Sequence, residues 1–156
     1  MRRLELRRHA RRRAGADALS TEGRAQAQAL GERSGVAYDR VFVSPAARAA
    51  ETAAWILRGA GQQLPDHAVV PGLAGDDRTG GSAEGMAAGV RALLAQVPDG
   101  GRGLAVSHTP FVERAAAGLG APIPPVAECE GILVTLRDDG AVEVLELRDV
   151  PATGGA

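Results

Sequence analysis

Short apolar segments that end abruptly in polar residues constrain the fold of this chain more than any other feature. Val41-Phe42-Val43 and Leu104-Ala105-Val106 are runs of the length and composition found in buried strands. Residues 3–8 alternate leucine with charged residues, which is the two-residue period of a strand. Helical patterns separate these runs, so strands and helices alternate. The alternation predicts a three-layer α/β/α sandwich with a mainly parallel sheet covered by helices on both faces.

The predicted strand over residues 3–8 contains two charged residues that do not suit a central position in a sheet. A central parallel strand is expected to be apolar on both faces, whereas Glu5 and Arg7 occupy one face of the 3–8 segment. Two explanations follow from the sequence: this face of the sheet is partly open, or the two side chains pair with each other.

Capping signals predict where the helices begin. Ser20 or Thr21 can cap one helix, and Ser44 can cap another in which Pro45 takes the first position. The apolar spacing and the breakers predict helices at about 21–34, 45–58, 84–97 and 111–119. Residues 132–137 and 142–147 flank a turn-forming Asp-Asp-Gly sequence and predict a closing antiparallel hairpin.

Length and composition predict one domain and exclude several classes of function. The 156 residues suit a single domain over 1–149 with a flexible C-terminal tail over 150–156. The net charge of −1 argues against a general nucleic-acid or membrane-surface protein, and no apolar run approaches the roughly 18 residues that span a bilayer. The single cysteine allows no intrachain disulfide and suits a reducing compartment, so a cytoplasmic location is expected. The sequence does not indicate an oligomeric state.

Polar residues that follow three of the predicted strands should meet at one edge of the sheet, where α/β proteins bind ligands. They are Arg8 and His9, then Ser44 and Arg48, then Ser107 and His108. The guanidinium fork matches phosphate oxygens, a helix N-terminus favours an anion, and a neutral imidazole can attack phosphorus. The pattern therefore predicts phosphoryl transfer through a histidine intermediate. Ser44 and Ser107 are interpreted first as structural residues, with a phosphate contact as the alternative.

Four motifs carry a family resemblance, and they occur in the family's order: Arg8-His9-Ala10, Leu19-Ser20-Thr21-Glu22-Gly23, Ser44-Pro45-Ala46-Ala47-Arg48 and Val106-Ser107-His108-Thr109-Pro110. Together they resemble the histidine phosphatase superfamily, which is phosphoglycerate-mutase-like. The short chain is most similar to the small SixA-type phosphohistidine phosphatase branch. The resemblance implies that His9 is the nucleophile and that Arg8, Arg48 and His108 form the phosphate pocket. It also implies that no metal ion or organic cofactor is needed.

The chain departs from the family in the loop after the second helix. Many members carry a glutamate general acid there, whereas residues 71–77 contain no glutamate. Asp76, Asp77 and Glu84 are the carboxylates that could substitute, and the other interpretation is that no acid exists. Imidazole has a reference pKa near 6.5 and leaves far more readily than an alkoxide. The missing glutamate therefore favours phosphohistidine on a protein as the substrate.

Three functions remain open on the sequence alone. The favoured one is a metal-independent phosphatase for a phosphorylated protein. A second is a broad phosphomonoesterase for small phosphate esters, with an acid from residues 72–85. A third is a non-catalytic module that binds phosphoprotein. The basic run at 11–13 is interpreted as a solvated loop in preference to a docking patch for an acidic substrate.

Overall fold

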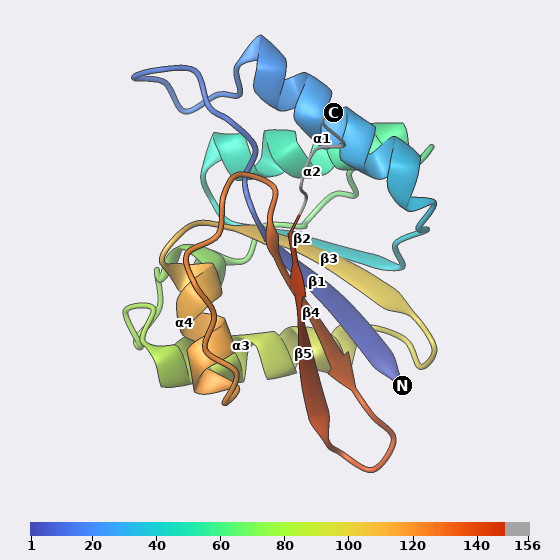
Figure 1. Ribbon diagram of the computed structural model, residues 1–156, viewed down its shortest axis with the longest axis vertical. Coiled ribbons are helices and arrows are strands. Elements are labelled where there is room, and N and C mark those ends of the chain that lie inside the picture. The colour runs from blue at the N-terminus through green and yellow to red at the C-terminus, as the bar shows by residue number, and fades with distance from the viewer. Residues whose placement is uncertain (149–156) are drawn as a thin grey trace.

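The computed structural model describes residues 1–148 and has a five-stranded sheet between two pairs of helices (Figure 1). The elements in chain order are β1 (Arg2–Arg8), α1 (Thr21–Ser34), β2 (Arg40–Val43), α2 (Ala47–Gly59), the 3-10 turn η1 (Pro71–Ala74), α3 (Ala83–Gln96), β3 (Arg102–Ser107), α4 (Phe111–Gly118), β4 (Gly131–Leu136) and β5 (Val142–Leu147). The strand order is β2-β3-β1-β4-β5. The predicted tail at 150–156 lies outside the described residues.

The sheet has the predicted mainly parallel arrangement. Strands β2, β3 and β1 are parallel neighbours, and β4 pairs antiparallel with both β1 and β5. Only β4 therefore runs against the other four strands, and the C-terminal hairpin is confirmed. In residues 1–148 no helix combines the length and apolar character that crossing a membrane requires.

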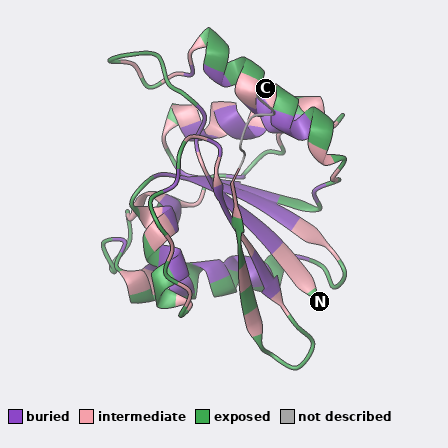
Figure 2. Ribbon diagram, in the orientation of Figure 1, coloured by how far each residue is buried: buried purple, intermediate pink, exposed green. Residues whose placement is uncertain are grey.

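Helices cover both faces of the sheet, as the alternation predicts. Figure 1 shows α1 and α2 on one side and α3 and α4 on the other. Buried side chains form one cluster on each side: Leu4 and Leu6 pack towards α3 and α4, while Leu104 and Val106 pack towards α1 and α2. Figure 2 shows this burial along the central strands and the inner helix faces. The two clusters hold the strand ends in fixed positions.

Glycines allow α1 and α2 to approach closely. A Cβ atom at Gly31 would lie 1.9 Å from the carbonyl oxygen of Ile56, and one at Gly59 would lie 2.1 Å from that of Gln28. Such distances are below any van der Waals contact, so a larger residue would force the helices apart. The tight pair fixes α2, whose first turn faces the strand ends.

The charged residues of β1 pair, and the face that they occupy is closed. Glu5 is fully buried; its Oε1 accepts hydrogen bonds from Nε of Arg7 at 2.8 Å and from the Tyr38 hydroxyl at 3.0 Å. Its Oε2 accepts from Nε of Arg102 at 2.8 Å. Burial raises the pKa of Tyr38, and the negative charge of Glu5 raises it further. The hydroxyl therefore stays protonated and acts as the donor. The pairing explanation is therefore confirmed.

One predicted helix boundary is wrong and the others hold closely. Ser20 caps α1 as predicted and accepts a hydrogen bond from the backbone N–H of Gly23. Helix α2, however, begins at Ala47 and not at Pro45, with Ala46 in the capping position and no side-chain cap of its own. The reason is that the side chain of Ser44 is engaged elsewhere, as described below. Helices α3 and α4 agree with their predicted limits to within one residue.

Candidate active site

The three strand ends that carry the predicted site residues lie side by side. In the parallel register, Arg8 of β1 is opposite Ser107 of β3, and Val43 of β2 is opposite Val106. Backbone hydrogen bonds continue the pairing beyond the strands, because the N–H of His9 donates to Ser107 and that of Ser44 donates to Val106. The predicted meeting of three turns at one sheet edge is thus what the fold contains.

The two histidines face each other in a buried position. Their ring centroids are 5.3 Å apart with the planes tilted by 59°, and His9 and His108 are only 8% and 7% exposed. Among residues 1–148, three buried nitrogens of the arginines and histidines of the site have no hydrogen-bond partner: Nε of Arg8, Nε of Arg48 and Nδ1 of His108. Buried polar atoms are costly to leave unpaired. An oxyanion with several acceptor oxygens would satisfy such donors together.

The backbone fixes the tautomer of His9. Its Nδ1 lies 2.7 Å from the carbonyl oxygen of Ala10. A carbonyl oxygen can only accept, so the proton resides on Nδ1 and the lone pair on Nε2. Burial lowers the pKa of His9, and the nearby charges of Arg48 and Arg8 lower it further. The ring is therefore neutral near pH 7, with Nε2 available as a nucleophile.

Ser44 orients the second histidine. Its Oγ lies 2.6 Å from Nε2 of His108, and Ser44 is 1% exposed. Burial, assisted by the charge of Arg48, lowers the pKa of His108 to about 4. When the hydroxyl donates to Nε2 of the neutral ring, the ring proton is on Nδ1, the atom without a protein partner. Nδ1 can then donate to a phosphate oxygen.

Ser107 has a structural contact of its own. Its hydroxyl donates to the carbonyl oxygen of Leu73 in η1 and is fully buried. This hydrogen bond holds the beginning of the loop at 72–85 against the end of β3. The first interpretation of Ser107, as a structural residue, therefore has a specific partner.

Arg48 is held at the start of α2 by an acidic residue that the sequence analysis missed. Both carboxylate oxygens of Asp17 accept backbone N–H groups, from Ala47 and from Arg48, each at 2.9 Å. Oδ1 also accepts from Nη1 of Arg48 at 3.0 Å. These hydrogen bonds, that from the Arg48 N–H foremost, lower the pKa of Asp17. Asp17 thus caps α2 from outside and positions the guanidinium group.

Arg8 is held by the segment that leads into β4. Its Nη1 donates to the carbonyl oxygen of Val126 at 3.0 Å, and the N–H of Val126 donates to Oε2 of Glu113 at 3.1 Å. The hydroxyl of Thr109, next to His108, donates to the same oxygen at 2.6 Å. Glu113 therefore links α4 to the backbone that holds Arg8. The sequence analysis gave Glu113 no role.

Within residues 1–148, the three predicted general acids make no hydrogen bond or ion pair with the histidines or arginines of the site. Asp76, Asp77 and Glu84 are all exposed. Oδ1 of Asp77 accepts hydrogen bonds from the backbone and side chain of Thr79, while Glu84 lies in the first turn of α3. Among the interactions of residues 1–148, none joins these carboxylates to the site. Their role as acids remains a prediction.

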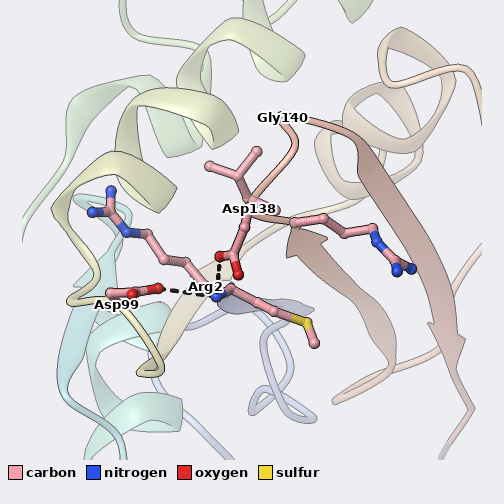
Figure 3. Close-up of a pocket in the computed structure, with 7 residues that line it drawn as sticks. Arg2, Asp99, Asp138 and Gly140 are labelled. Carbon is pink, nitrogen blue, oxygen red and sulfur yellow. Dashed lines mark hydrogen bonds and ion pairs between the residues drawn. The ribbon is translucent and has the colours of Figure 1, made fainter.

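In the part of the chain that the structure describes, no donor set for a metal ion accompanies the site. Within residues 1–148, no three His, Cys, Asp or Glu side chains are grouped so that they could hold a metal. A separate pocket, of about 370 Å³, lies at the other end of the sheet (Figure 3). There the amino group of Met1 pairs with Asp99 at 2.9 Å and with Asp138 at 2.7 Å. None of the arginines, histidines or serines of the candidate active site lines this pocket.

Comparison with protein families identifies the class to which this arrangement belongs. A model of the histidine phosphatase superfamily (branch 1) matches residues 5–99, more than half of the chain. The chain therefore belongs to the histidine phosphatase superfamily, and the resemblance inferred from the four motifs is confirmed. At this coarse level it is a phosphatase, with the substrate undetermined. Comparison with curated proteins gives no match.

Solved structures show the same fold over nearly the whole chain. The protein histidine phosphatase SixA complexed with tungstate is 26% identical, with a TM-score of 0.71 and coverage of 94% of this chain and 96% of that one. Phosphoserine phosphatase of Entamoeba histolytica, a mutant in complex with phosphoserine, is 16% identical, with a TM-score of 0.74 and coverage of 95% and 97%. Phosphoglycerate mutase of Bacillus anthracis is 15% identical, with a TM-score of 0.73 and coverage of 93% and 92%. The last two, at these identities, support the fold alone.

Proposed function

We propose that the protein hydrolyses phosphohistidine on a protein substrate through a phosphohistidine intermediate on His9. The observation that carries this proposal is the hydrogen bond from Nδ1 of His9 to the Ala10 carbonyl, which leaves the lone pair of the ring on Nε2. Likeness to SixA over nearly the whole chain supports the choice of substrate. So does the position of the candidate acids, which make no contact with the site.

In the first step, Nε2 of His9 attacks phosphorus. A P–N bond to His9 forms as the P–N bond of the substrate breaks, and the electron pair of that bond returns to the leaving imidazole. Before the bond breaks, the other nitrogen of the substrate ring takes a proton from solvent, at a reference pKa near 6.5, so the ring leaves as neutral imidazole. Nδ1 of His9 keeps its proton and its bond to Ala10. No acidic side chain is needed in this step.

In the second step, water attacks the phosphorus of phospho-His9. The new P–O bond forms as the P–Nε2 bond breaks, the electron pair returns to Nε2, and the proton of the attacking water passes to phosphate or solvent. Arg8, Arg48 and His108 bind the phosphoryl oxygens in both steps and stabilise the charge of each transition state. Because two guanidinium groups supply the positive charge, the reaction is proposed to need no metal ion.

One observation favours a second function, the hydrolysis of small phosphate esters. The hydrogen bond from Ser107 to Leu73 holds the loop at 72–85 beside the end of β3. A carboxylate of this loop would then protonate an alkoxide leaving group. The non-catalytic alternative is less well supported, since a phosphate-binding module has no need of a free Nε2 on a buried histidine.

The test compares phosphate release from a phosphohistidine peptide and from p-nitrophenyl phosphate, with and without EDTA. Wild type should turn over the peptide preferentially and without regard to EDTA, while His9→Ala should lose turnover by at least 10³-fold. A rapid alkaline quench, which preserves the acid-labile P–N bond, should trap phosphate on wild type but not on the variant. Preference for the ester, lost in Asp76→Asn, Asp77→Asn or Glu84→Gln, would establish the second function instead. Phosphate-dependent binding without turnover would reject both.

A further inference from the structure

We propose that the loop at 10–19 docks acidic residues that flank the phosphohistidine of a protein substrate. This inference rests on the proposed function and names the substrate feature that the site would recognise. The docking surface consists of Arg11, Arg12 and Arg13, and we refer to the loop that carries it as the basic hairpin. The sequence alone favoured a solvated loop for these arginines, and the structure adds three observations.

First, the basic hairpin has a closed backbone. Arg12 and Leu19 form an isolated antiparallel bridge, and the N–H of Arg13 donates to the carbonyl oxygen of Ala18 at 2.8 Å. The N–H of Ser20 donates to the carbonyl oxygen of Arg11 at 3.0 Å. The three arginines are therefore carried by a segment with regular hydrogen bonding, which lowers the entropy cost of using them together in binding.

Second, the hairpin is anchored to the helices behind it. The carboxylate of Asp17 binds the first turn of α2, and the N–H of Leu19 donates to Oε1 of Glu51 at 2.9 Å. Leu19 is 2% exposed, and a Cβ atom at Gly23 would lie 2.0 Å from the Arg11 carbonyl oxygen. One of these anchors, Asp17, also holds Arg48, so the hairpin has a fixed position relative to that arginine of the site.

Third, the three guanidinium groups are available. Arg11, Arg12 and Arg13 are exposed, and within residues 1–148 none of their guanidinium groups makes a hydrogen bond or an ion pair. Other arginines of the same region are already paired, Arg24 with Glu51 and Arg48 with Asp17. Hydrogen bonding lowers the pKa of Glu22 and the nearby charge of Arg11 contributes to the lowering, but within residues 1–148 no ion pair joins the two side chains. The hairpin therefore presents positive charge that no ion pair neutralises.

The position of this charge determines the partner. The hairpin continues directly from His9, and the charge of Arg12 is among the causes that lower the pKa of His9, so its field reaches the nucleophile. A peptide whose phosphohistidine occupies the pocket would pass the hairpin with its neighbouring residues. Glutamate and aspartate at those positions would pair with the arginines and speed the encounter.

The experiment uses two synthetic peptides, each phosphorylated on its single histidine with phosphoramidate. One carries Glu and Asp on both sides of the histidine, and the other carries Gln and Asn at the same positions. The test variant replaces Arg11, Arg12 and Arg13 by Gln. The matched control replaces Arg40, Arg91 and Arg137 by Gln, which changes the net charge equally. Arg91 is an exposed residue of α3, Arg40 begins β2 and Arg137 follows the last residue of β4.

At low salt, wild type should show a kcat/KM about tenfold higher for the acidic peptide than for the neutral one, because its KM for the acidic peptide is lower. Adding 0.5 M NaCl should remove most of this difference. The test variant should lose this advantage and keep activity on the neutral peptide within twofold, while the control keeps both. Equal kcat/KM for the two peptides in wild type, or an unchanged advantage in the test variant, would overturn the docking proposal alone. Turnover of neither peptide by wild type would instead reject the proposed function.

Discussion

Single atoms decide the protonation states on which the chemistry depends. The carbonyl of Ala10 assigns the proton of His9 to Nδ1, and the hydroxyl of Ser44 lies against Nε2 of His108. Both rings are buried next to two arginines, so adding a proton to either brings a third positive charge into a desolvated site. Both imidazoles of the site are therefore neutral near pH 7.

The first prediction at this scale concerns the titration of the two rings. Because the pKa of His9 is lowered and that of His108 is lowered to about 4, both should titrate below the ordinary histidine value of 6.5. Histidine-selective NMR measures this directly, since the chain has only three histidines. Arg48→Gln, which removes one of the causes, should raise both pKa values. Titration of His9 at or above 6.5 would contradict the account of its neutral state.

The same shifts link the site to stability. Between the folded pKa of His108 and 6.5, the unfolded chain binds a proton that the folded chain does not. The free energy of unfolding therefore decreases as the pH falls through this range. Oxyanion binding offsets the effect, because a bound phosphate favours the protonated rings.

At the scale of elements, the relation between the basic hairpin and α2 determines the position of Arg48. Helix α2 has no cap within its own sequence, and Asp17 supplies one across thirty residues of chain. Thr52 completes the junction, because its hydroxyl accepts the N–H of Ala10 and donates to the carbonyl oxygen of Arg48. Loop and helix therefore act as one unit.

Asp17→Ala tests this unit. The variant loses the cap of α2 and should lower the free energy of unfolding by about 1 kcal/mol, with little added by the ion pair because Asp17 is 51% exposed. KM for the phosphohistidine peptide should rise several-fold as Arg48 loses its orientation, and Asp17→Asn should restore part of the loss. The measurements are urea unfolding and steady-state kinetics.

The control for this test is Asp39→Ala. Oδ2 of Asp39 also accepts a backbone N–H, that of Arg102 at 2.9 Å, but at the opposite edge of the sheet. A similar loss of stability with unchanged KM is expected. If Asp17→Ala lowered the free energy of unfolding but left KM unchanged, as expected for Asp39→Ala, the Asp17 carboxylate would cap α2 without positioning Arg48.

The sequence predicted those parts of the elements and the site that local signals define. The apolar runs of β2 and β3, the Ser20 cap and the strand-end residues Arg8 and His9 were all found in this way. The start of α2 was missed because its cap comes from Asp17 and because Ser44 contacts His108. These are contacts between residues far apart in the chain, and no local pattern encodes them.

For the whole molecule, the buried Glu5 joins parts of the chain that are distant in sequence. It accepts hydrogen bonds from Arg7 of its own strand, from Arg102 of β3 and from Tyr38, which precedes β2. The sequence marked Glu5 as unusual but could not name the last two partners. Through these hydrogen bonds the Glu5 carboxylate connects β1, β3 and the segment before β2, and so stabilises the parallel part of the sheet.

Glu5→Ala should therefore destabilise the fold strongly. Removing the carboxylate removes an ion-pair partner of two arginines, one of them deeply buried, and should cost about 3–5 kcal/mol. Tyr38→Phe removes a single donor and should cost only about 1–2 kcal/mol. Urea unfolding measures the free energy of unfolding of both variants. If Glu5→Ala lowered it no more than Tyr38→Phe, the ion pairs of Glu5 would contribute little to stability.

The reversed direction of β4 has a practical consequence. Because β4 runs against its neighbours, the turn over 137–141 that joins it to β5 lies at the edge of the sheet opposite the three turns that carry the candidate site (Figure 1). The turn is exposed and closed by the bond from the N–H of Arg137 to the carbonyl oxygen of Ala141. A fluorophore, an affinity tag or a surface linker attached there would leave the pocket facing solution, so the turn is a natural attachment point for immobilising the enzyme in an oriented form.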